Sequence, residues 1–286
     1  MQELINAQFN LVGLIGNPIK HSLSPLLHNY LFNMLNIKAV YLAFPVENHF
    51  LERAVQGLVA LNAKGFNVTI PYKESIIPFL NKLDDLAKDV GAVNTVVIDQ
   101  GTSIGYNTDV SGFLKSLKKN GFDPKDKVTA VIGTGGAARA AIIGLLHAGS
   151  SQVHIIGRNI DKAQQIFDIY ANSHANKLKV IEIDKTASVF EQCALIVNAT
   201  PIGMYGYLEK SMPLSEEYIP NQCLIYDMVY NPLETVLLKK AKSKGCQVIN
   251  GLDMLIYQGA DAFKLWTGIE PPIDLIYDFL KKHVTI

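Results

Sequence analysis

The sequence contains little cysteine. Its three cysteines, Cys193, Cys223 and Cys246, have no paired spacing among the 286 residues. This scatter excludes a disulfide framework and a cysteine-based zinc site, and it indicates free thiols in a reducing compartment. The chain does not open with a basic region followed by a long apolar run, so we expect no secretory signal. The expectations are a cytoplasmic location and no bound metal.

Neither sign of charge is in excess, and no long apolar run is present. Lysine plus arginine and aspartate plus glutamate number 26 each, so no overall field favours nucleic acid or a membrane surface. No apolar stretch approaches the roughly 20 residues that a membrane-spanning helix needs. We therefore expect no nucleic-acid or membrane partner, and any anion site must be local. Both a monomer and a homodimer are compatible with this composition.

Strand-like apolar runs and helical patterns alternate along the chain, which indicates an α/β protein. Hydrophobic residues make up 49% of the chain and charged residues 18%, and 286 residues are enough for two compact domains. In the first half we predict strands at residues 10–15, 39–45, 65–70, 92–98 and 104–106, with helices at 25–35 and 51–61. A hairpin-like return at residues 99–101 predicts that this half forms a mixed sheet.

After Asn107 the pattern becomes more regular. Six strands, predicted at residues 128–132, 152–156, 179–183, 195–198, 224–227 and 247–250, alternate with helices or loops. This is the element count of a doubly wound, Rossmann-type dinucleotide-binding domain. The segment from Gly251 to Ile286 is helical and has no strand of its own to cover, so we expect it to pack back on the first half. The prediction is a discontinuous substrate-binding domain (residues 1–109 and 253–286) and a dinucleotide-binding domain (residues 110–252).

A glycine-rich turn joins the predicted strand at residues 128–132 to an alanine-rich helix. Gly133, Gly135 and Ala138 match the pattern G-x-G-x-x-A. The first glycine permits a tight turn, the second lets the backbone approach a pyrophosphate, and the alanine allows close packing of helix and strand. The N–H groups at the helix start then face the phosphates. A purely structural turn is the alternative, but the strand–turn–helix context favours a dinucleotide.

The next predicted strand ends in a basic residue. An NAD-binding protein usually has an acidic residue at this strand end, where it holds the ribose 2′-hydroxyl. This chain has Arg158, with Lys162 one helical turn further on. A planar guanidinium suits a 2′-phosphate, so the pattern favours NADP or NADPH over NAD. The alternative interpretation of Arg158 is a solvated charge at a strand end.

Short polar clusters stand at several predicted strand ends of the first half. Ser22 and Ser24 precede a helix start at Pro25, where they either cradle a carboxylate or cap the helix. The other polar groups in such places are Asn67, Thr69, Lys73, Asn94 and Asp109. Lys73 by itself is equally typical of a surface lysine. Gathered near a domain boundary, these side chains predict a ligand-binding cleft.

Taken together, several short stretches that contain these residues resemble the shikimate dehydrogenase family. In family order they are GLIGNPIKHSLSPLLH (13–28), NVTIPYK (67–73), GAVNT (91–95), GYNTD (105–109), GTGGAAR (133–139), NATPIGM (198–204), DMVYNP (227–232) and GLDMLIYQ (251–258). The resemblance runs through nearly the whole chain. It implies reversible oxidation of shikimate to 3-dehydroshikimate with NADP, in the chorismate pathway to aromatic amino acids.

The resemblance also implies roles for individual residues. The substrate carboxylate would be held by Ser22, Ser24 and Tyr230, and the ring hydroxyls by Asn67, Thr69, Asn94 and Gln258. Lys73 and Asp109 would be the catalytic pair. The dinucleotide would be bound by Gly133, Thr134, Gly135, Gly136, Ala137, Arg158, Asn159 and Lys162, and its nicotinamide half would lie near Thr200, Met228 and Gly251.

The sequence departs from the family pattern at two places. Thr134 stands where the family often has alanine, and Gly157-Arg158-Asn159 replaces its usual Asn-Arg-Thr, so the arginine is kept while two hydrogen-bonding positions change. Two alternative functions stay open. A dual-specificity relative would also oxidise quinate, with NAD or NADP, and a non-catalytic sensor would bind NADP on the same fold. The sequence does not assign the proton acceptor within the catalytic pair, which we treat as coupled.

Overall fold

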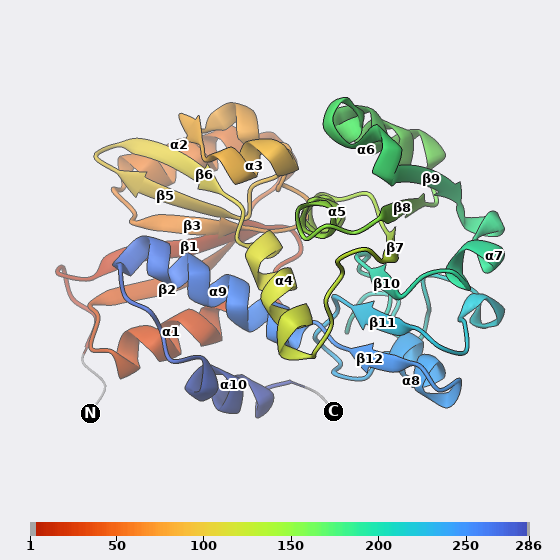
Figure 1. Cartoon of the computed structure of the whole chain (residues 1–286). Helices are drawn as coiled ribbons and strands as arrows, with labels where there is room; N and C mark the ends of the chain where they lie inside the picture. The colour runs from red at the N-terminus through yellow and green to blue at the C-terminus, as the bar shows by residue number, and fades with distance from the viewer. Residues whose placement is uncertain (1–3, 285–286) are drawn as a thin grey trace. The chain divides into compact units, whose positions relative to one another are not determined.

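The chain folds into two compact units. The computed structural model describes residues 4–284. The first unit comprises residues 4–108 and Ile256–Lys282, and the second comprises Asp109–Leu255 together with His283 and Val284. Residues 1–3 and 285–286, which the predicted domain includes, lie outside the described residues. Across residues 4–284, no helix is long and apolar enough to cross a membrane. Each unit is built around its own six-stranded sheet (Figure 1).

The sheet of the first unit is mixed, as predicted. Its strands are β1 (Asn10–Gly16), β2 (Ala39–Pro45), β3 (Gly65–Val68), β4 (Lys82–Leu83), β5 (Thr95–Asp99) and β6 (Thr102–Tyr106). They lie in the order β2-β1-β3-β5-β6-β4. β1 is parallel to β2 and β3, whereas β5 is antiparallel to β3 and β6. The ends of β1, β3 and β6 and the start of β5 therefore meet at one edge of the sheet.

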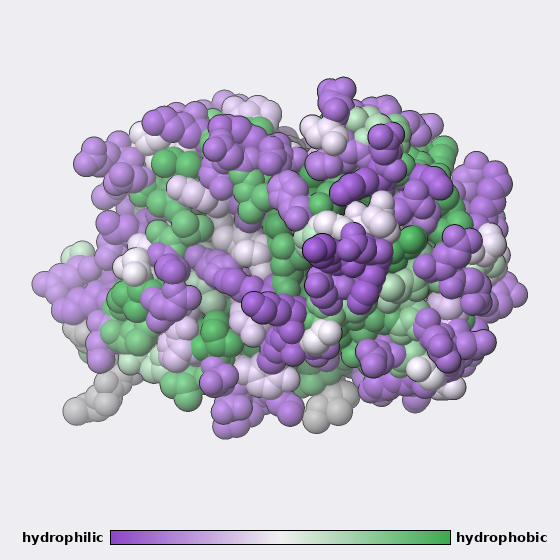
Figure 2. Space-filling view, in the orientation of Figure 1, coloured by the Kyte–Doolittle hydropathy of each residue, from purple (hydrophilic) through white to green (hydrophobic). Residues whose placement is uncertain are grey.

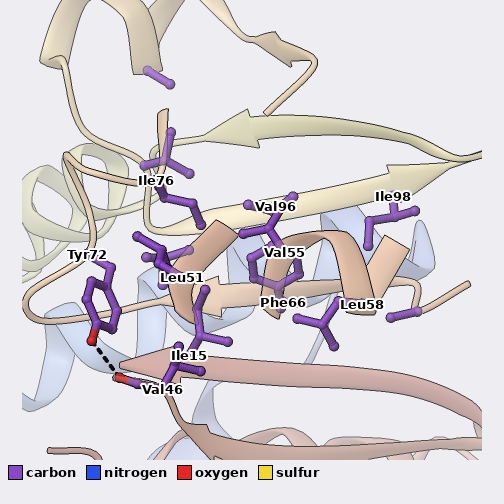
Figure 3. Packing of buried hydrophobic residues seen from close by; sticks show 14 residues of the cluster. Ile15, Val46, Leu51, Val55, Leu58, Phe66, Tyr72, Ile76, Val96 and Ile98 are labelled. Atoms are coloured by element: carbon purple, nitrogen blue, oxygen red, sulfur yellow. Dashed lines mark hydrogen bonds between the residues drawn. The ribbon is translucent and has the colours of Figure 1, made fainter. Parts of the chain in front are cut away.

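Helices cover this sheet. They are α1 (Ser24–Met34), α2 (Leu51–Ala60), α3 (Asp85–Val90), α9 (Leu252–Thr267, from Ile256 onwards) and α10 (Ile273–Lys281), with short 3-10 turns at Asn48–Phe50 and Ile77–Phe79. Val55 and Leu58 of α2 pack with Phe66 and Val96 of the sheet in one buried core (Figure 3). Because successive strand residues point to opposite faces, Phe66 enters this core and Asn67 points away from it.

The C-terminal helices pack back on the first unit, which confirms the prediction. Trp266 of α9 donates its Nε1–H to the carbonyl of Val96 in β5 at 2.9 Å. The indole lies against Gly65, where an added Cβ would stand 2.3 Å from Nε1. Tyr30 of α1 and Phe279 of α10 stack with their ring centres 4.0 Å apart. The last two helices are thus attached both to the sheet and to α1.

The second unit contains a fully parallel sheet. Its strands are β7 (Val128–Ile132), β8 (Gln152–Gly157), β9 (Leu178–Glu182), β10 (Leu195–Asn198), β11 (Leu224–Asp227) and β12 (Gln247–Ile249). Their order is β12-β11-β10-β7-β8-β9. Counted from β7 this is the strand order 3-2-1-4-5-6 of dinucleotide-binding folds, which confirms the predicted Rossmann-type architecture. Ligands bind such sheets outside the carboxyl ends of the strands where the order reverses, here between β7 and β10.

Helices cover both faces of the parallel sheet. They are α4 (Asp109–Lys119), α5 (Gly136–His147), α6 (Ile160–His174), α7 (Ala187–Phe190) and α8 (Val236–Ser243), with short 3-10 turns at Ala175–Lys177, Ile183–Lys185 and Glu216–Tyr218. Phe113 of α4 meets Tyr226 of β11 edge-on at 5.1 Å, whereas the neighbouring Ile225 packs with Phe190 of α7 and Leu237 of α8. Hydrophilic side chains are spread over the visible face of each unit (Figure 2).

Several strand bounds in the first unit differ from the predictions, among them the start of β6, which is Thr102 instead of residue 104. β3 ends at Val68 instead of residue 70, and Ile70 is 50% exposed because the chain turns there ahead of Pro71. β5 starts at Thr95, so Asn94 lies before the strand and not within it. The two-residue edge strand β4 was not predicted, since two residues are too short to show a period.

Candidate active site

Polar side chains gather at the sheet edge of the first unit where β1, β3 and β6 end. The N–H of Thr69 donates to the carbonyl of Ile15 at 3.0 Å, and the N–H of Asn94 donates to that of Tyr106 at 3.1 Å. Asn67 lies one strand position before Val68, at the end of β3. The mixed topology therefore brings three predicted substrate residues together, although they are far apart in sequence.

Asn94 is the centre of a buried hydrogen-bond network at this edge, and only 2% of its surface is exposed. Its Oδ1 accepts from the N–H of Thr108 at 2.8 Å and from the hydroxyl of Thr95 at 3.1 Å. Its Nδ2 lies 2.9 Å from Thr108 Oγ1 and 3.3 Å from Gln258 Oε1, to which it can donate. The network thus brings Gln258 of α9 to the same edge and anchors the residue before Asp109.

Asn67 is buried as well, and its amide is engaged within the protein. Its Oδ1 accepts from the hydroxyl of Tyr41 at 2.7 Å. Its Nδ2 donates to the carbonyl of Asn94 at 3.1 Å and to Thr95 Oγ1 at 3.0 Å. Both N–H groups of this amide therefore have acceptors, so a ligand oxygen accepts from it only by displacing one of them.

The two predicted serines lie at the start of α1. Ser22 Oγ accepts from the N–H of Ser24 at 3.3 Å, and Ser24 is 9% exposed. Leu23 occupies the N-cap position and makes no side-chain cap, so neither serine is the N-cap residue. Pro25 follows within the first turn and has no N–H. The two hydroxyls and the amino end of an eleven-residue helix suit a carboxylate.

The predicted catalytic residues stand in different units. Lys73 is half-buried, and its carbonyl accepts from the N–H of Val93 at 2.7 Å, which holds its backbone beside the residue before Asn94. Asp109 is the first residue of α4 in the second unit and is 4% exposed. A carboxylate is electrostatically favourable at a helix amino end.

A glycine lies at the switch point of the parallel sheet, the place between β7 and β10 where the strand order reverses. Gly133 has a φ of +130°, which residues with a side chain rarely adopt, and an added Cβ would stand 3.1 Å from the carbonyl of Ala199. Gly133 therefore lets the chain after β7 approach the chain after β10. Thr200 follows directly, and its hydroxyl donates to Asn198 Oδ1 at 2.7 Å. Two of the predicted cofactor residues, Gly133 and Thr200, thus meet at the switch point.

The amino end of α5 is open to a ligand. Gly135 is its extended N-cap residue, and an added Cβ would meet no atom within 4 Å. Thr134, Gly136 and Ala137 are half-buried around it. α5 has twelve residues, and the unpaired N–H groups and positive dipole at its start suit a pyrophosphate. The residues present therefore fit a dinucleotide.

Two cationic side chains lie beyond the end of β8. Arg158 and Lys162 are both exposed. An added Cβ on Gly157 would stand 2.8 Å from Thr134 Cγ2, so the end of β8 lies against the glycine-rich turn. Asn159 is the N-cap of α6, because its Oδ1 accepts from the N–H of Lys162 at 3.0 Å. The side-chain oxygen of Asn159 thus has a structural partner that the sequence pattern did not indicate.

One buried carboxylate connects the loops after β10 and β11. Asp227 Oδ1 accepts from Asn198 Nδ2 at 2.9 Å and from the N–H of Val229 at 3.1 Å, and Oδ2 accepts from the hydroxyl of Thr235 at 2.6 Å. Burial raises the pKa of Asp227 to about 6, although the three hydrogen bonds act in the opposite direction. Thr235 is also the N-cap of α8. Asp227 therefore holds the backbone at the carboxyl ends of two neighbouring strands.

The remaining predicted residues follow β11 and β12. Gly251 donates its N–H to the carbonyl of Val229 at 3.0 Å, and an added Cβ would stand 2.1 Å from the carbonyl oxygen of Met228. Gly251 and Met228 therefore lie together, and only glycine fits at this contact. Tyr230 is half-buried in the same unit, whereas the serines predicted to share the carboxylate with it belong to the first unit.

Sequence reasoning gave no role to Tyr41, Asp227 or Thr235. Their partners lie 26 residues away for Tyr41 and Asn67, 29 for Asp227 and Asn198, and 8 for Thr235 and Asp227. Only Thr235 had a local signal, because a threonine directly before a helical run is typical of an N-cap.

We expect Thr235→Val to destabilise the protein more at about pH 8 than at about pH 5. Because the pKa of Asp227 is raised above its ordinary value, its contribution to stability is present at low pH and is lost as the pH rises through about 6. Thr235 stabilises the charged form, so losing its hydroxyl should cost about 1–3 kcal/mol above this pKa and clearly less below it. Urea unfolding at the two pH values measures the difference.

Thr129→Val is the matched control. Thr129 is buried in β7, and its hydroxyl donates to the backbone carbonyl of Gln152 at 3.2 Å, which does not titrate. Its substitution should cost the same at both pH values. An equally pH-independent loss for Thr235→Val would show that Thr235 does not stabilise the anion.

Known proteins match this chain over most of its length. The model of the shikimate dehydrogenase substrate binding domain matches residues 14–96, that of shikimate / quinate 5-dehydrogenase residues 116–212, and that of the shikimate 5'-dehydrogenase C-terminal domain residues 251–279. The chain is 44% identical over 277 residues to the shikimate dehydrogenase (NADP(+)) of Carboxydothermus hydrogenoformans, covering 95% of this chain and 96% of that protein.

Solved structures agree with this match. A shikimate dehydrogenase crystallised in complex with NADP+ superimposes with a TM-score of 0.92 at 39% identity, covering 100% of this chain and 99% of that one. The shikimate 5-dehydrogenase of Listeria monocytogenes, in complex with shikimate and NAD, gives 0.88 at 37% identity, covering 98% and 99%. The resemblance and the two-sheet fold expected from the sequence are confirmed, and the chain belongs to the shikimate dehydrogenase family.

Proposed function

We propose that this chain catalyses the reversible oxidation of shikimate to 3-dehydroshikimate with NADP, as a step in the biosynthesis of aromatic amino acids. The observation that carries the proposal is the fit of one dinucleotide site, where a glycine-lined switch point and an open helix start are combined with a basic residue, Arg158, at the end of β8. The curated relative at 44% identity is a shikimate dehydrogenase (NADP(+)), which supports the same cofactor.

We assign the substrate to the first unit and NADP to the second. With the limits predicted from the sequence, these are residues 1–109 with 253–286 and residues 110–252. Ser22, Ser24 and Tyr230 would hold the carboxylate, and Asn67, Thr69, Asn94 and Gln258 would bind ring hydroxyls. A ring oxygen that accepts from the amide of Asn67 or Asn94 would replace one of the present acceptors of that amide. A cytoplasmic location is supported by the three free cysteines.

The cofactor would be held by the second unit at the ends of its parallel strands. Gly133, Thr134, Gly135, Gly136 and Ala137 would surround the pyrophosphate. Arg158 and Lys162 would bind the 2′-phosphate, next to the Asn159 cap. Thr200, Met228 and Gly251 would line the nicotinamide half, where Gly251 lets two chain segments approach. When bound, nicotinamide supplies the hydride acceptor for the carbinol carbon of shikimate.

The proton of the oxidised hydroxyl is the part of the reaction that side chains must handle. Lys73 and Asp109 are the proposed pair for this task. The neutral amine of Lys73 has a lone pair that can accept the proton, and the carboxylate of Asp109 can accept it directly or orient the hydroxyl. Asn94 would fix the ring in the first unit, because its amide is held by two threonines.

We expect the purified chain to form NADPH from shikimate, and we expect Lys73→Ala and Asp109→Ala to lower kcat by about 10²–10⁴-fold, because positioned acid–base groups contribute to that extent. Both variants should keep the fold and bind NADP normally. The assay follows NADPH absorbance with shikimate and then quinate, each with NADP and NAD. Quinate turnover as fast as shikimate turnover would indicate dual specificity, and NADP binding without turnover of either acid would indicate a sensor.

Arg158→Ala should weaken NADP by about 10- to 100-fold and change NAD little, because a charge-assisted hydrogen bond to the 2′-phosphate contributes about 1.5–3 kcal/mol. Binding titrations with the two dinucleotides measure this ratio. Arg53→Ala is the matched control, since Arg53 is an exposed arginine on α2 of the first unit. Equal loss of NADP and NAD in Arg158→Ala would make Arg158 a structural residue.

A further inference from the structure

Behind the proposed substrate residues lies a buried aromatic cluster that contains polar atoms. His28 of α1 is 1% exposed and stacks on Tyr41 of β2 at 4.6 Å between ring centres, with the edge of Trp266 at 5.1 Å. Burial lowers the pKa of His28 to about 3, so the ring is neutral at physiological pH and carries one N–H. The sequence analysis assigned no role to His28, Tyr41 or Trp266, although His28 ends the stretch at residues 13–28.

This cluster contacts the substrate edge through Asn67. The hydroxyl of Tyr41 donates to Asn67 Oδ1 at 2.7 Å. On the other side of the amide, Asn67 Nδ2 donates to the backbone carbonyl of Asn94 at 3.1 Å. Because this carbonyl can only accept, it fixes which end of the Asn67 amide is nitrogen, and the oxygen faces the Tyr41 hydroxyl.

The orientation of Asn67 determines the direction of the next hydrogen bonds. Its Nδ2 must donate, and it does so to Thr95 Oγ1 at 3.0 Å. Because Thr95 Oγ1 accepts this hydrogen bond, its own hydroxyl proton is available to donate to Asn94 Oδ1 at 3.1 Å. The N–H of Thr108 donates to the same oxygen at 2.8 Å. The Nδ2 end of Asn94 is thereby kept on the side of Gln258 as a donor.

We propose that Tyr41 is a positioning residue, which holds Asn94 in place through Asn67 and Thr95 and so positions the Asn94 amide for the substrate ring. This inference rests on the proposed function. Without the Tyr41 hydroxyl, Asn67 Oδ1 loses its hydrogen-bond donor, and the amide that donates to the carbonyl of Asn94 and to Thr95 Oγ1 is held less firmly. Asn94 is then positioned less firmly, and the ring is held less well.

Tyr41→Phe tests the proposal, because it removes one hydroxyl and keeps the ring that packs on His28. We expect the KM for shikimate to rise by about 5- to 30-fold, since the loss of a buried hydrogen-bond donor has a cost of this order. The KM for NADP should change less than about twofold and kcat less than the KM for shikimate. Thr95→Val interrupts the chain at its middle and should raise the same KM, which keeps the test valid if Tyr41→Phe folds poorly.

Tyr72→Phe is the matched control. Tyr72 is a buried tyrosine of the same unit, 1% exposed like Tyr41, and its hydroxyl donates to the backbone carbonyl of Val46 outside this chain of bonds (Figure 3). It should lower the melting temperature about as much as Tyr41→Phe and leave the KM for shikimate unchanged. A rise in KM that is equal in the two tyrosine variants, or absent from Tyr41→Phe and Thr95→Val, would overturn the proposal. Failure of the wild-type chain to oxidise shikimate would instead contradict the proposed function.

Discussion

A buried amide has two donors and two acceptor lone pairs, and all of them need partners because an unpaired group costs about 1–3 kcal/mol. This constraint governs the edge of the first sheet. Asn67 and Asn94 are 6% and 2% exposed, and each is bonded through both its oxygen and its nitrogen. Their bonds reach β2, β5 and α9, so the donors and acceptors offered to a ligand are fixed before the ligand arrives. Such preorganisation is what hydride transfer to a positioned cofactor requires.

The second unit solves the same problem with a carboxylate. Asp227 satisfies donors from two loops and a helix cap, and its raised pKa reflects how completely it is removed from water. The neighbouring glycines, Gly133 and Gly251, let backbone segments come close where any side chain would collide. In both units the proposed ligand-binding groups lie at or next to strand ends, where the topology of the sheet determines which distant segments meet.

The sequence predicted the parts of the structure that have a local or periodic signal. The alternating strands, the glycine turn before α5 and Arg158 at the end of β8 could be read from spacing, and the family resemblance supplied the proposed substrate residues. The networks around Asn94 and Asp227 could not be predicted, because the sequence does not indicate which distant partners folding brings to Thr108, Gln258 and Thr235. The ends of β3 and β5 were misplaced because the turn at Ile70 and the bonds of Asn94 override strand propensity. The two-residue strand β4 has no period to detect.

A double-mutant cycle between Tyr41→Phe and Thr95→Val tests most directly whether these buried bonds act as one chain. The quantity to measure is the KM for shikimate at saturating NADP in the wild type, both single variants and the double variant. If Tyr41 acts through Thr95, Tyr41→Phe raises the KM in the wild type but changes it little once Thr95 is valine, which gives a strongly non-additive cycle. Fold-changes that simply multiply in the double variant would contradict the account, because the two hydroxyls would then act independently.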